Sequence, residues 1–176
     1  ETGSVAPSSR FLARQYCDSA DIEKRSFVVE IGPAAGAITE TLIRRLSLDA
    51  EYFAIEVNPS FVKQFRARFP GVEIHHDSLE QLPTYLSQHG VTSCDCIVSG
   101  IPWTNLAGET QNKYTDVIVD SLSESGVFVT MVYIQSPFMP AGRRYRECLE
   151  ARFSRVRLSK LVYLNFPPAY LYVCEK

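Results

Sequence analysis

Short apolar runs alternate with longer amphipathic segments along most of the chain. Each apolar run is four to eight residues long, and the runs 27–31, 52–57 and 94–99 end at Gly or Asn, which is typical of a buried strand. The segments between them repeat apolar residues at helical spacing, as Ile38, Leu42, Ile43 and Leu46 do. The predicted strands are 27–31, 52–57, 72–75, 94–99, 127–134, 156–163 and 169–174. The predicted helices are 37–48, 59–69, 78–88, 110–123 and 141–153.

This alternation of strand and helix predicts an α/β fold, with a mostly parallel sheet and helices on both faces. The last two strands are separated by Asn165-Phe166-Pro167-Pro168, which is short enough for an antiparallel hairpin at one edge. No linker divides residues 5–176, so we expect one domain there. Residues 1–4, Glu-Thr-Gly-Ser, are interpreted as a remnant of cloning.

Composition and charge narrow the classes of partner. The 176 residues are 45% hydrophobic and carry a formal net charge of −2, which excludes a globally cationic nucleic-acid binder. The stretch 143–160 nevertheless holds seven basic and two acidic residues. Such a segment indicates contact with an anionic surface, and a solvated amphipathic helix explains it equally well.

Cysteine and histidine give no metal-binding pattern. The five cysteines form no C-x-x-C pair, and we expect free thiols in a reducing, intracellular compartment. Cys94 and Cys96 are expected to face the same side of a strand. His75 and His76 are neighbours on a strand, so one should be in the core and one exposed. His89 is interpreted as a surface residue.

Chemically informative residues follow the first three strands. Gly32 and Gly36 permit a tight turn that lets a ligand approach the backbone, and the turn lacks the basic residues of a phosphate site. Glu56 ends the second strand and is placed to bind two ribose hydroxyls. Asp77 follows the third strand and can accept a hydrogen bond from an exocyclic amine. Each carboxylate could instead serve only as a helix N-terminal residue.

The series E-I-G-P-A-A-G, I-E-V-N-P, H-D-S and S-G-I-P-W resembles the motifs of class I S-adenosylmethionine-dependent methyltransferases. The resemblance implies a Rossmann-like, seven-stranded, mostly parallel sheet with one antiparallel edge strand. It also implies S-adenosylmethionine as cofactor, S-adenosylhomocysteine as product, and no metal. The residues it implies for cofactor binding are Glu30, Gly32, Pro33, Ala34, Gly36, Ile38, Glu56, Val57, Asp77, Ser78, Leu79 and Gly100.

Two branches share the E-x-G-P start, the ribosomal-RNA adenine dimethylases and the bacterial phospholipid N-methyltransferases. Gly100 stands where the RNA branch has the Asn that holds its target amine. The segments 6–13 and 165–169 are similar to the lipid branch, in which a basic amphipathic helix precedes the first of them. Ala34 departs from the usual Gly.

The lipid branch implies stepwise methylation of the amine of phosphatidylethanolamine to give phosphatidylcholine. Other amine lipids, such as ornithine lipids, stay open. The residues expected at the reacting amine are Gly100, Pro102, Trp103 and Tyr133. Ser9, Phe166, Arg143, Arg144 and Arg146 are expected to contact the lipid substrate or an anionic membrane. Aromatic faces would stabilise the cationic product.

The expected location is the cytoplasm, with the protein peripherally bound to the inner face of the cytoplasmic membrane. We expect no nucleic-acid partner and no obligate protein partner. The alternatives are an RNA adenine N6-methyltransferase, another amine methyltransferase, or a domain that binds a nucleoside or lipid without turnover.

Overall fold

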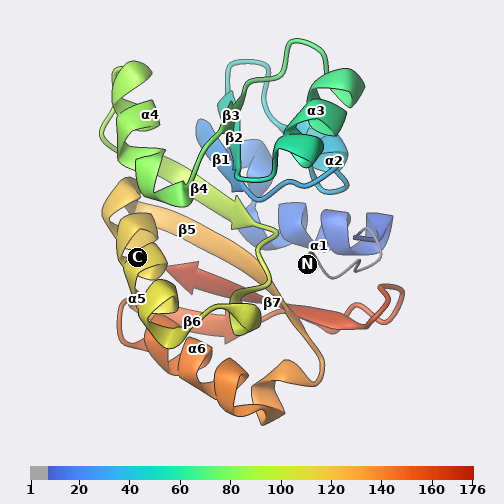
Figure 1. Cartoon of the computed structure of the whole chain (residues 1–176), viewed down its shortest axis with the longest axis vertical. Helices are drawn as coiled ribbons and strands as arrows, with labels where there is room; N and C mark the ends of the chain where they lie inside the picture. The colour runs from blue at the N-terminus through green and yellow to red at the C-terminus, as the bar shows by residue number, and fades with distance from the viewer. Residues whose placement is uncertain (1–7) are drawn as a thin grey trace.

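The computed structural model of the chain describes residues 8–176, so residues 1–7, which include the predicted remnant 1–4 and the start of the segment 6–13, lie outside the described part. Strands and helices alternate as predicted (Figure 1). The strands are β1 (Phe27–Ile31), β2 (Glu51–Glu56), β3 (Ile74–His76), β4 (Cys94–Ser99), β5 (Leu122–Tyr133), β6 (Arg155–Leu158) and β7 (Ala169–Glu175). The α-helices are α1 (Arg10–Ala20), α2 (Thr39–Arg45), α3 (Pro59–Arg68), α4 (Leu82–Gln88), α5 (Gly108–Ser121) and α6 (Pro140–Glu150). Short 3-10 helices are η1 (Ile22–Lys24), η2 (Leu79–Gln81), η3 (Trp103–Asn105) and η4 (Ser136–Phe138).

All seven strands form one sheet in the order β3-β2-β1-β4-β5-β7-β6. The first five strands along the chain pair in parallel, and β7 pairs antiparallel with both β5 and β6. The predicted antiparallel hairpin is therefore confirmed, and its second strand lies between β5 and the edge strand β6. The strand order reverses between β1 and β4, which is where parallel sheets of this kind bind ligands.

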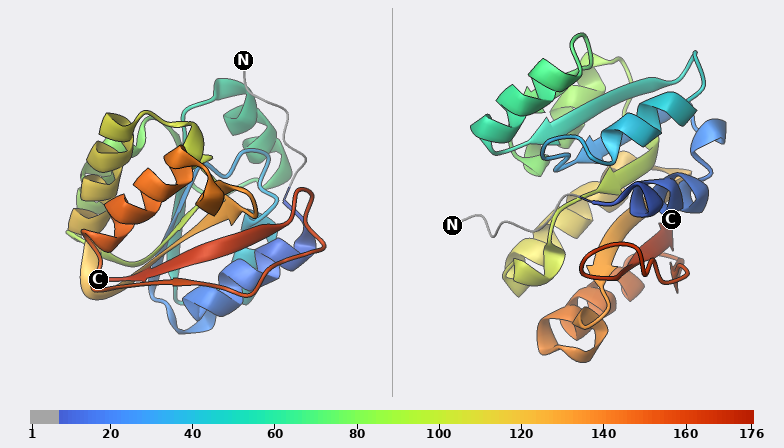
Figure 2. Two further views of the ribbon diagram at one scale, coloured as in Figure 1. Left: turned by 90° about the horizontal axis from the view of Figure 1, so that it is seen from below. Right: turned by 90° about the vertical axis from the view of Figure 1, so that its right-hand side faces the viewer.

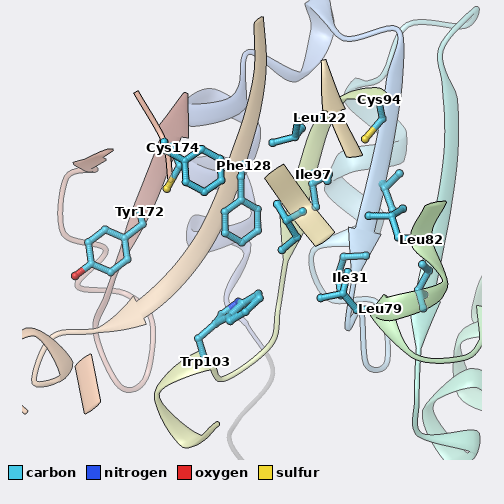
Figure 3. Close-up of a cluster of buried hydrophobic side chains, with 14 of the residues drawn as sticks. Ile31, Leu79, Leu82, Cys94, Ile97, Trp103, Leu122, Phe128, Tyr172 and Cys174 are labelled. Carbon is cyan, nitrogen blue, oxygen red and sulfur yellow. The ribbon is translucent and has the colours of Figure 1, made fainter. Parts of the chain in front are cut away.

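Helices cover both faces of the sheet (Figure 2). On one face, Leu12 and Tyr16 of α1 and Leu42 of α2 pack on alternate residues of β1 and β4. On the other face, α4, α5 and α6 bury a larger cluster that includes Trp103, Phe128 and Tyr145 (Figure 3). Because both faces are covered, all five residues of β1 are buried, as its continuous apolar run predicts.

Capping residues set the starts of two predicted helices. The Asn58 side chain accepts a hydrogen bond from the Ser60 N–H at 2.9 Å, and Pro59 occupies the first turn of α3. Ser78 caps η2, so the segment predicted to be one helix from residue 78 begins as a 3-10 turn before α4. These caps fix where the chain turns away from the ends of β2 and β3.

One prediction about strand faces is wrong. Cys94 packs in the cluster beneath α4 and α5, whereas Cys96 packs against α1 and α2. The β4–β5 register shifts between these two residues, so the simple two-residue period fails there. All five cysteines are buried free thiols. Within residues 8–176, no helix has the length and apolar character needed to cross a membrane.

Candidate functional site

The turn after β1 has an unusual backbone. Gly32, Ala34 and Gly36 all have positive φ, at 67°, 50° and 79°. Glycine adopts this left-handed region freely, whereas alanine does so only at a cost. Ala34 therefore occupies a position whose backbone favours glycine, the residue that the motif resemblance implies there. The Gly36 N–H donates to the Pro33 carbonyl at 2.8 Å, which closes the turn.

Glu56 joins this turn to the end of β2. It is 7% exposed, and both its carboxylate oxygens accept hydrogen bonds from backbone N–H groups. Ala34 donates to Oε2 at 3.1 Å, and Asn58 donates to Oε1 at 2.9 Å. The carboxylate is thus held at a fixed position between two loops at the carboxyl edge of the sheet.

Asp77 lies at the same edge, one strand further out. Its backbone N–H donates to the Glu56 carbonyl at 3.2 Å. Its carboxylate accepts hydrogen bonds from the Tyr85 hydroxyl at 2.8 Å and from the Ser78 N–H at 2.7 Å. These two bonds, the Tyr85 bond first, lower the pKa of Asp77, so it is an ionised acceptor at neutral pH.

Gly100 packs directly against Gly32. The Gly100 N–H donates to the Ile31 carbonyl at 2.9 Å, and a Cβ on Gly100 would lie 2.6 Å from the Gly32 carbonyl oxygen. Only glycine allows the loop after β4 to approach the turn after β1 this closely. The predicted reacting-amine loop and the predicted methionine-binding turn are therefore neighbours.

The prediction that the Trp103 ring lines the site is wrong. Trp103 is 1% exposed and lies within the buried cluster (Figure 3). Its ring stacks on that of Tyr145 with centroids 5.0 Å apart. Its Nε1 donates to the buried Ser99 hydroxyl at 3.1 Å. The 3-10 turn that starts at Trp103 directs the indole back into the core, so Trp103 supports the loop after β4 from the core side.

Sequence reasoning missed two residues that hold this loop. The Ser99 hydroxyl also accepts from the Ile101 N–H at 3.2 Å, and the Tyr16 hydroxyl of α1 donates to the Ser99 carbonyl at 2.6 Å. Burial raises the pKa of Tyr16 well above its ordinary value, so the phenol stays a donor. A serine at the end of an otherwise apolar strand was the available signal for Ser99. Tyr16 gave none, because its partner is 83 residues away.

Glu30 is buried beneath the turn and is 1% exposed. Its Oε2 accepts hydrogen bonds from the hydroxyls of Thr39 and Tyr52, at 2.7 and 2.5 Å. Its Oε1 is buried without a hydrogen-bond partner among the described residues. Burial raises the pKa of Glu30 to about 7, against the lowering effect of the two hydroxyls.

The remaining predicted cofactor residues differ in exposure. The side chains of Ile38 and Leu79 are buried in the core, so neither is available to a ligand as an open surface. Val57 is 62% exposed beside Glu56. The Ser78 hydroxyl caps η2 by accepting a hydrogen bond from the Glu80 N–H at 3.3 Å.

On the predicted substrate side, Ser9 and the loop before β7 are joined. The Ser9 N–H donates to Asn165 Oδ1 at 2.9 Å, and Asn165 Nδ2 donates to the Pro167 carbonyl at 2.7 Å. Ser9 also caps α1 through its hydroxyl. Phe166, next to the buried Asn165, is 82% exposed. Tyr133 is half-buried, and burial raises its pKa.

The basic stretch is more neutralised than its sequence suggests. Arg146 pairs with Glu150 at 2.8 Å, and Arg152 pairs with Asp116 at 2.6 Å. Arg155 and Arg157 both lie within 4 Å of Glu175. Arg143 and Arg144 are exposed at the start of α6 and have no carboxylate partner within residues 8–176. With the exposed Lys160, which also has no carboxylate partner within residues 8–176, they are the part of the basic stretch whose charge is not neutralised.

No family model matches the sequence. An ornithine lipid N-methyltransferase from Singulisphaera acidiphila is 28% identical over 175 residues, which covers 98% of this chain and 87% of that protein. Ribosomal RNA small subunit methyltransferase A from a Synechococcus strain is 34% identical over 100 residues, which is 55% of this chain and 35% of that protein.

Solved structures share the fold at lower identity. The O-methyltransferase TomG from Streptomyces achromogenes, in complex with S-adenosylmethionine, has a TM-score of 0.74 and 19% identity over 99% of this chain and 83% of its own. A Bacillus cereus O-methyltransferase in complex with S-adenosylhomocysteine has a TM-score of 0.74 and 16% identity, covering 96% and 82%. The predicted sheet and the resemblance drawn from the motifs are confirmed. The chain therefore has the fold of class I S-adenosylmethionine-dependent methyltransferases, and its sequence is similar to a lipid N-methyltransferase over almost its whole length.

Proposed function

We propose that the chain transfers methyl groups from S-adenosylmethionine to the amine of a membrane-lipid head group. Phosphatidylethanolamine, methylated stepwise to phosphatidylcholine, is the first substrate to test, and an ornithine lipid is the second. The observation that carries the proposal is a set of exposed apolar side chains on two loops at the edge that holds the candidate site.

The carboxyl edge fits the cofactor. The glycine turn after β1 presents backbone to a ligand, and the unpartnered Oε1 of Glu30 beneath it would be satisfied by the ammonium of the methionine end. Glu56 would hold the ribose hydroxyls, Asp77 the adenine amine, and the exposed Val57 the adenine face. When bound, S-adenosylmethionine supplies a methyl group carried on a sulfonium, and S-adenosylhomocysteine is the product that remains.

The chain's own residues contribute mainly orientation. The loop 99–103 is anchored by Tyr16, by the Ser99 hydroxyl and by the contact of Gly100 with Gly32, so it would hold the amine in line with the methyl group. In that position the amine could accept the methyl group, with a new N–C bond in place of the C–S bond, and it would give up a proton. Because burial raises the pKa of Tyr133, its phenol is a poor base, and water is the better proton acceptor.

Exposed apolar residues indicate where a lipid surface would lie. The loop after β5 exposes Phe138 (81%) and Met139 (49%), and the loop before β7 exposes Tyr163 (76%), Leu164 (65%) and Phe166 (82%). The two loops leave the sheet together, since the Ile134 N–H donates to the Pro168 carbonyl at 3.0 Å. The β6–β7 loop projects beyond the carboxyl edge of the sheet (Figure 1). Exposed apolar and aromatic side chains of this kind are typical of a membrane-contact surface.

Charge supports the same orientation. Arg143 and Arg144 lie near the start of α6, which begins at Pro140, the residue after the exposed Met139. Basic residues beside an anionic bilayer contribute about 1 kcal/mol each. We therefore propose peripheral binding to the cytoplasmic face of the cytoplasmic membrane.

An RNA substrate is the second candidate, because of the similarity to ribosomal RNA methyltransferases. Those arginines would serve RNA phosphates equally well. The absence of the Asn amide at Gly100 and the exposed apolar loops favour lipid. A domain that binds without turnover is the third candidate.

A mixed assay separates the three. The purified chain is incubated with methyl-labelled S-adenosylmethionine, vesicles of phosphatidylethanolamine and phosphatidylglycerol, and unmodified ribosomal RNA, and the label is measured in each fraction. Label in the lipid is expected. Label only in RNA supports the second candidate, and label in neither, even when ornithine-lipid vesicles are added, contradicts turnover on these lipids.

A further inference from the structure

A second group of side chains lies away from the candidate methyl-transfer site, on the face of the outer strands covered by α4. Glu73 directly precedes β3, His75 lies in β3, and His89 follows α4. One ligand-type atom of each residue lies within 4.8 Å of the others. The prediction that His89 is a surface residue is therefore wrong, because the end of α4 brings it against β2 and β3.

The spacing of the donor atoms suits a small divalent ion. Glu73 Oε1 lies 2.9 Å from His75 Nε2 and 3.4 Å from His89 Nε2. Zinc–nitrogen and zinc–oxygen bonds of about 2.0–2.1 Å in a tetrahedral site place neighbouring donors about 3.3 Å apart. Two of the three donor pairs are thus spaced close to neighbouring corners of a tetrahedron, and the third pair lies within 4.8 Å.

A hydrogen-bond explanation of the cluster is incomplete. His75 Nε2 is buried and has no partner with hydrogen-bond geometry among residues 8–176, although Glu73 Oε1 is near. Such a nitrogen offers a lone pair to a metal. Glu51 adds the outer contact that metal-bound histidines usually have, since its Oε2 lies 2.9 Å from His89 Nδ1, on the far side of the ring.

Aromatic packing fixes both imidazole rings. Tyr85 stacks on His75 with ring centroids 3.7 Å apart, and Phe53 stacks on His89 at 5.2 Å. Their orientation is therefore set before a metal arrives, which lowers the entropic cost of binding. His75 and His89 are 18% and 20% exposed, so solvent can supply the ion and a water as fourth ligand.

We propose that Glu73, His75 and His89 form a zinc-binding site, with Glu51 orienting His89. Two imidazoles and one carboxylate favour a transition-metal ion over Mg²⁺ or Ca²⁺. The site would hold the outer strands against α4, and none of its ligands is a residue proposed to contact the cofactor or the amine. It is independent of the proposed function.

The test is calorimetric titration of the chelator-treated full chain with zinc chloride, with magnesium chloride as the comparison. One zinc per chain and no magnesium binding are expected. His75→Asn and His89→Asn should abolish binding, and Glu51→Gln should weaken it about 10-fold or more. His76→Asn is the matched control, because His76 is exposed on the same strand and its Nε2 contacts the Val57 carbonyl instead.

A thermal-unfolding measurement is added in case the histidine variants do not fold. Glu73→Gln changes a 44% exposed side chain, and it should remove the rise in melting temperature that zinc gives the parent chain. The proposal is overturned if the parent chain binds no zinc, or if zinc binding survives unchanged in folded His75, His89 or Glu73 variants. Binding that persists in those variants would point to the cysteine thiols.

Discussion

The backbone N–H of Ala34 donates a hydrogen bond to Glu56 Oε2 at 3.1 Å, across 22 residues of sequence. This contact fixes the glycine turn after β1 relative to the carboxylate at the end of β2. It means that the predicted methionine and ribose subsites form one rigid unit at the strand-order reversal, where α/β sheets bind ligands.

Replacement of Glu56 tests that unit. Glu56→Gln keeps the size of the side chain and removes its charge, so it weakens the two backbone hydrogen bonds and the expected bonds to ribose. Charged hydrogen bonds contribute about 1.5–3 kcal/mol, so S-adenosylmethionine affinity should fall about 10-fold or more by calorimetry. Glu124→Gln, an exposed acidic residue near the start of β5, is the control. Equal affinities of the two variants would reject the ribose assignment.

Gly100 should tolerate no side chain. A Cβ would lie 2.6 Å from the Gly32 carbonyl oxygen, so Gly100→Ala should displace the loop and lower the free energy of unfolding by about 1–3 kcal/mol in urea titrations. Gly100→Asn should lose stability too, and it should not gain RNA methylation.

The matched control for Gly100 is Gly108→Ala in the first turn of α5. Its added Cβ would meet only Arg144 Nε, at 3.9 Å, and alanine favours helix. A stable, active Gly100→Ala variant would show that the approach of the two loops is not needed.

Glu30 should make stability depend on pH. Its pKa in the folded chain, about 7, is above its ordinary value of 4.5, so the folded state binds more protons between these pH values. The free energy of unfolding should therefore fall as pH rises from about 4.5 to about 7, by an amount on the order of 3 kcal/mol.

Glu30→Gln supplies the comparison for that slope. Its amide oxygen can still accept from Thr39 and Tyr52, and it does not titrate. Urea unfolding at pH 5 and pH 8 should show a smaller difference for this variant than for the parent chain. If the free energy of unfolding depends on pH equally in both, a group other than Glu30 is responsible for the pH dependence.

Replacing the exposed apolar loop residues should weaken binding to vesicles and leave the affinity for S-adenosylmethionine unchanged. Leu164→Ser with Phe166→Ser removes two apolar side chains from the loop before β7, and burial of such side chains is favourable by about 1.5–3 kcal/mol each. Sedimentation with phosphatidylethanolamine–phosphatidylglycerol vesicles should fall at least 10-fold, with S-adenosylmethionine affinity unchanged. Leu48→Ser is the control, because Leu48 is fully exposed before β2, at the opposite edge of the sheet. A similar loss for Leu48→Ser would remove the argument for a directed membrane surface.

Local patterns were sufficient for most elements after residue 26 and for the chemically informative strand ends, since strand ends, glycine turns and caps are encoded within a few residues. Helix α1 was not predicted, and β6 ends at Leu158, whereas the predicted strand runs to residue 163. Asn58 and Pro59 start a helix in the structure as they do in the sequence. Side-chain direction after a strand was not predictable in this way. Trp103 follows Pro102 in what reads as an exposed loop, yet its indole is drawn into the core by Ser99 and Tyr145.

Contacts between distant segments were also beyond the sequence. Asn165 binds the backbone of Ser9 from 156 residues away, and His89 meets His75 only because α4 returns along the outer strands. Pairing within the basic segment depended on Asp116 and Glu175, which lie outside it.

The most direct test of the account is a crystal structure of the chain with S-adenosylhomocysteine. The account predicts the ribose hydroxyls on the Glu56 carboxylate, the methionine end over the turn from Gly32 to Gly36, and the adenine amine on Asp77. A ligand bound elsewhere on the molecule, or bound at this edge with Glu56 still held only by Ala34 and Asn58, would contradict it.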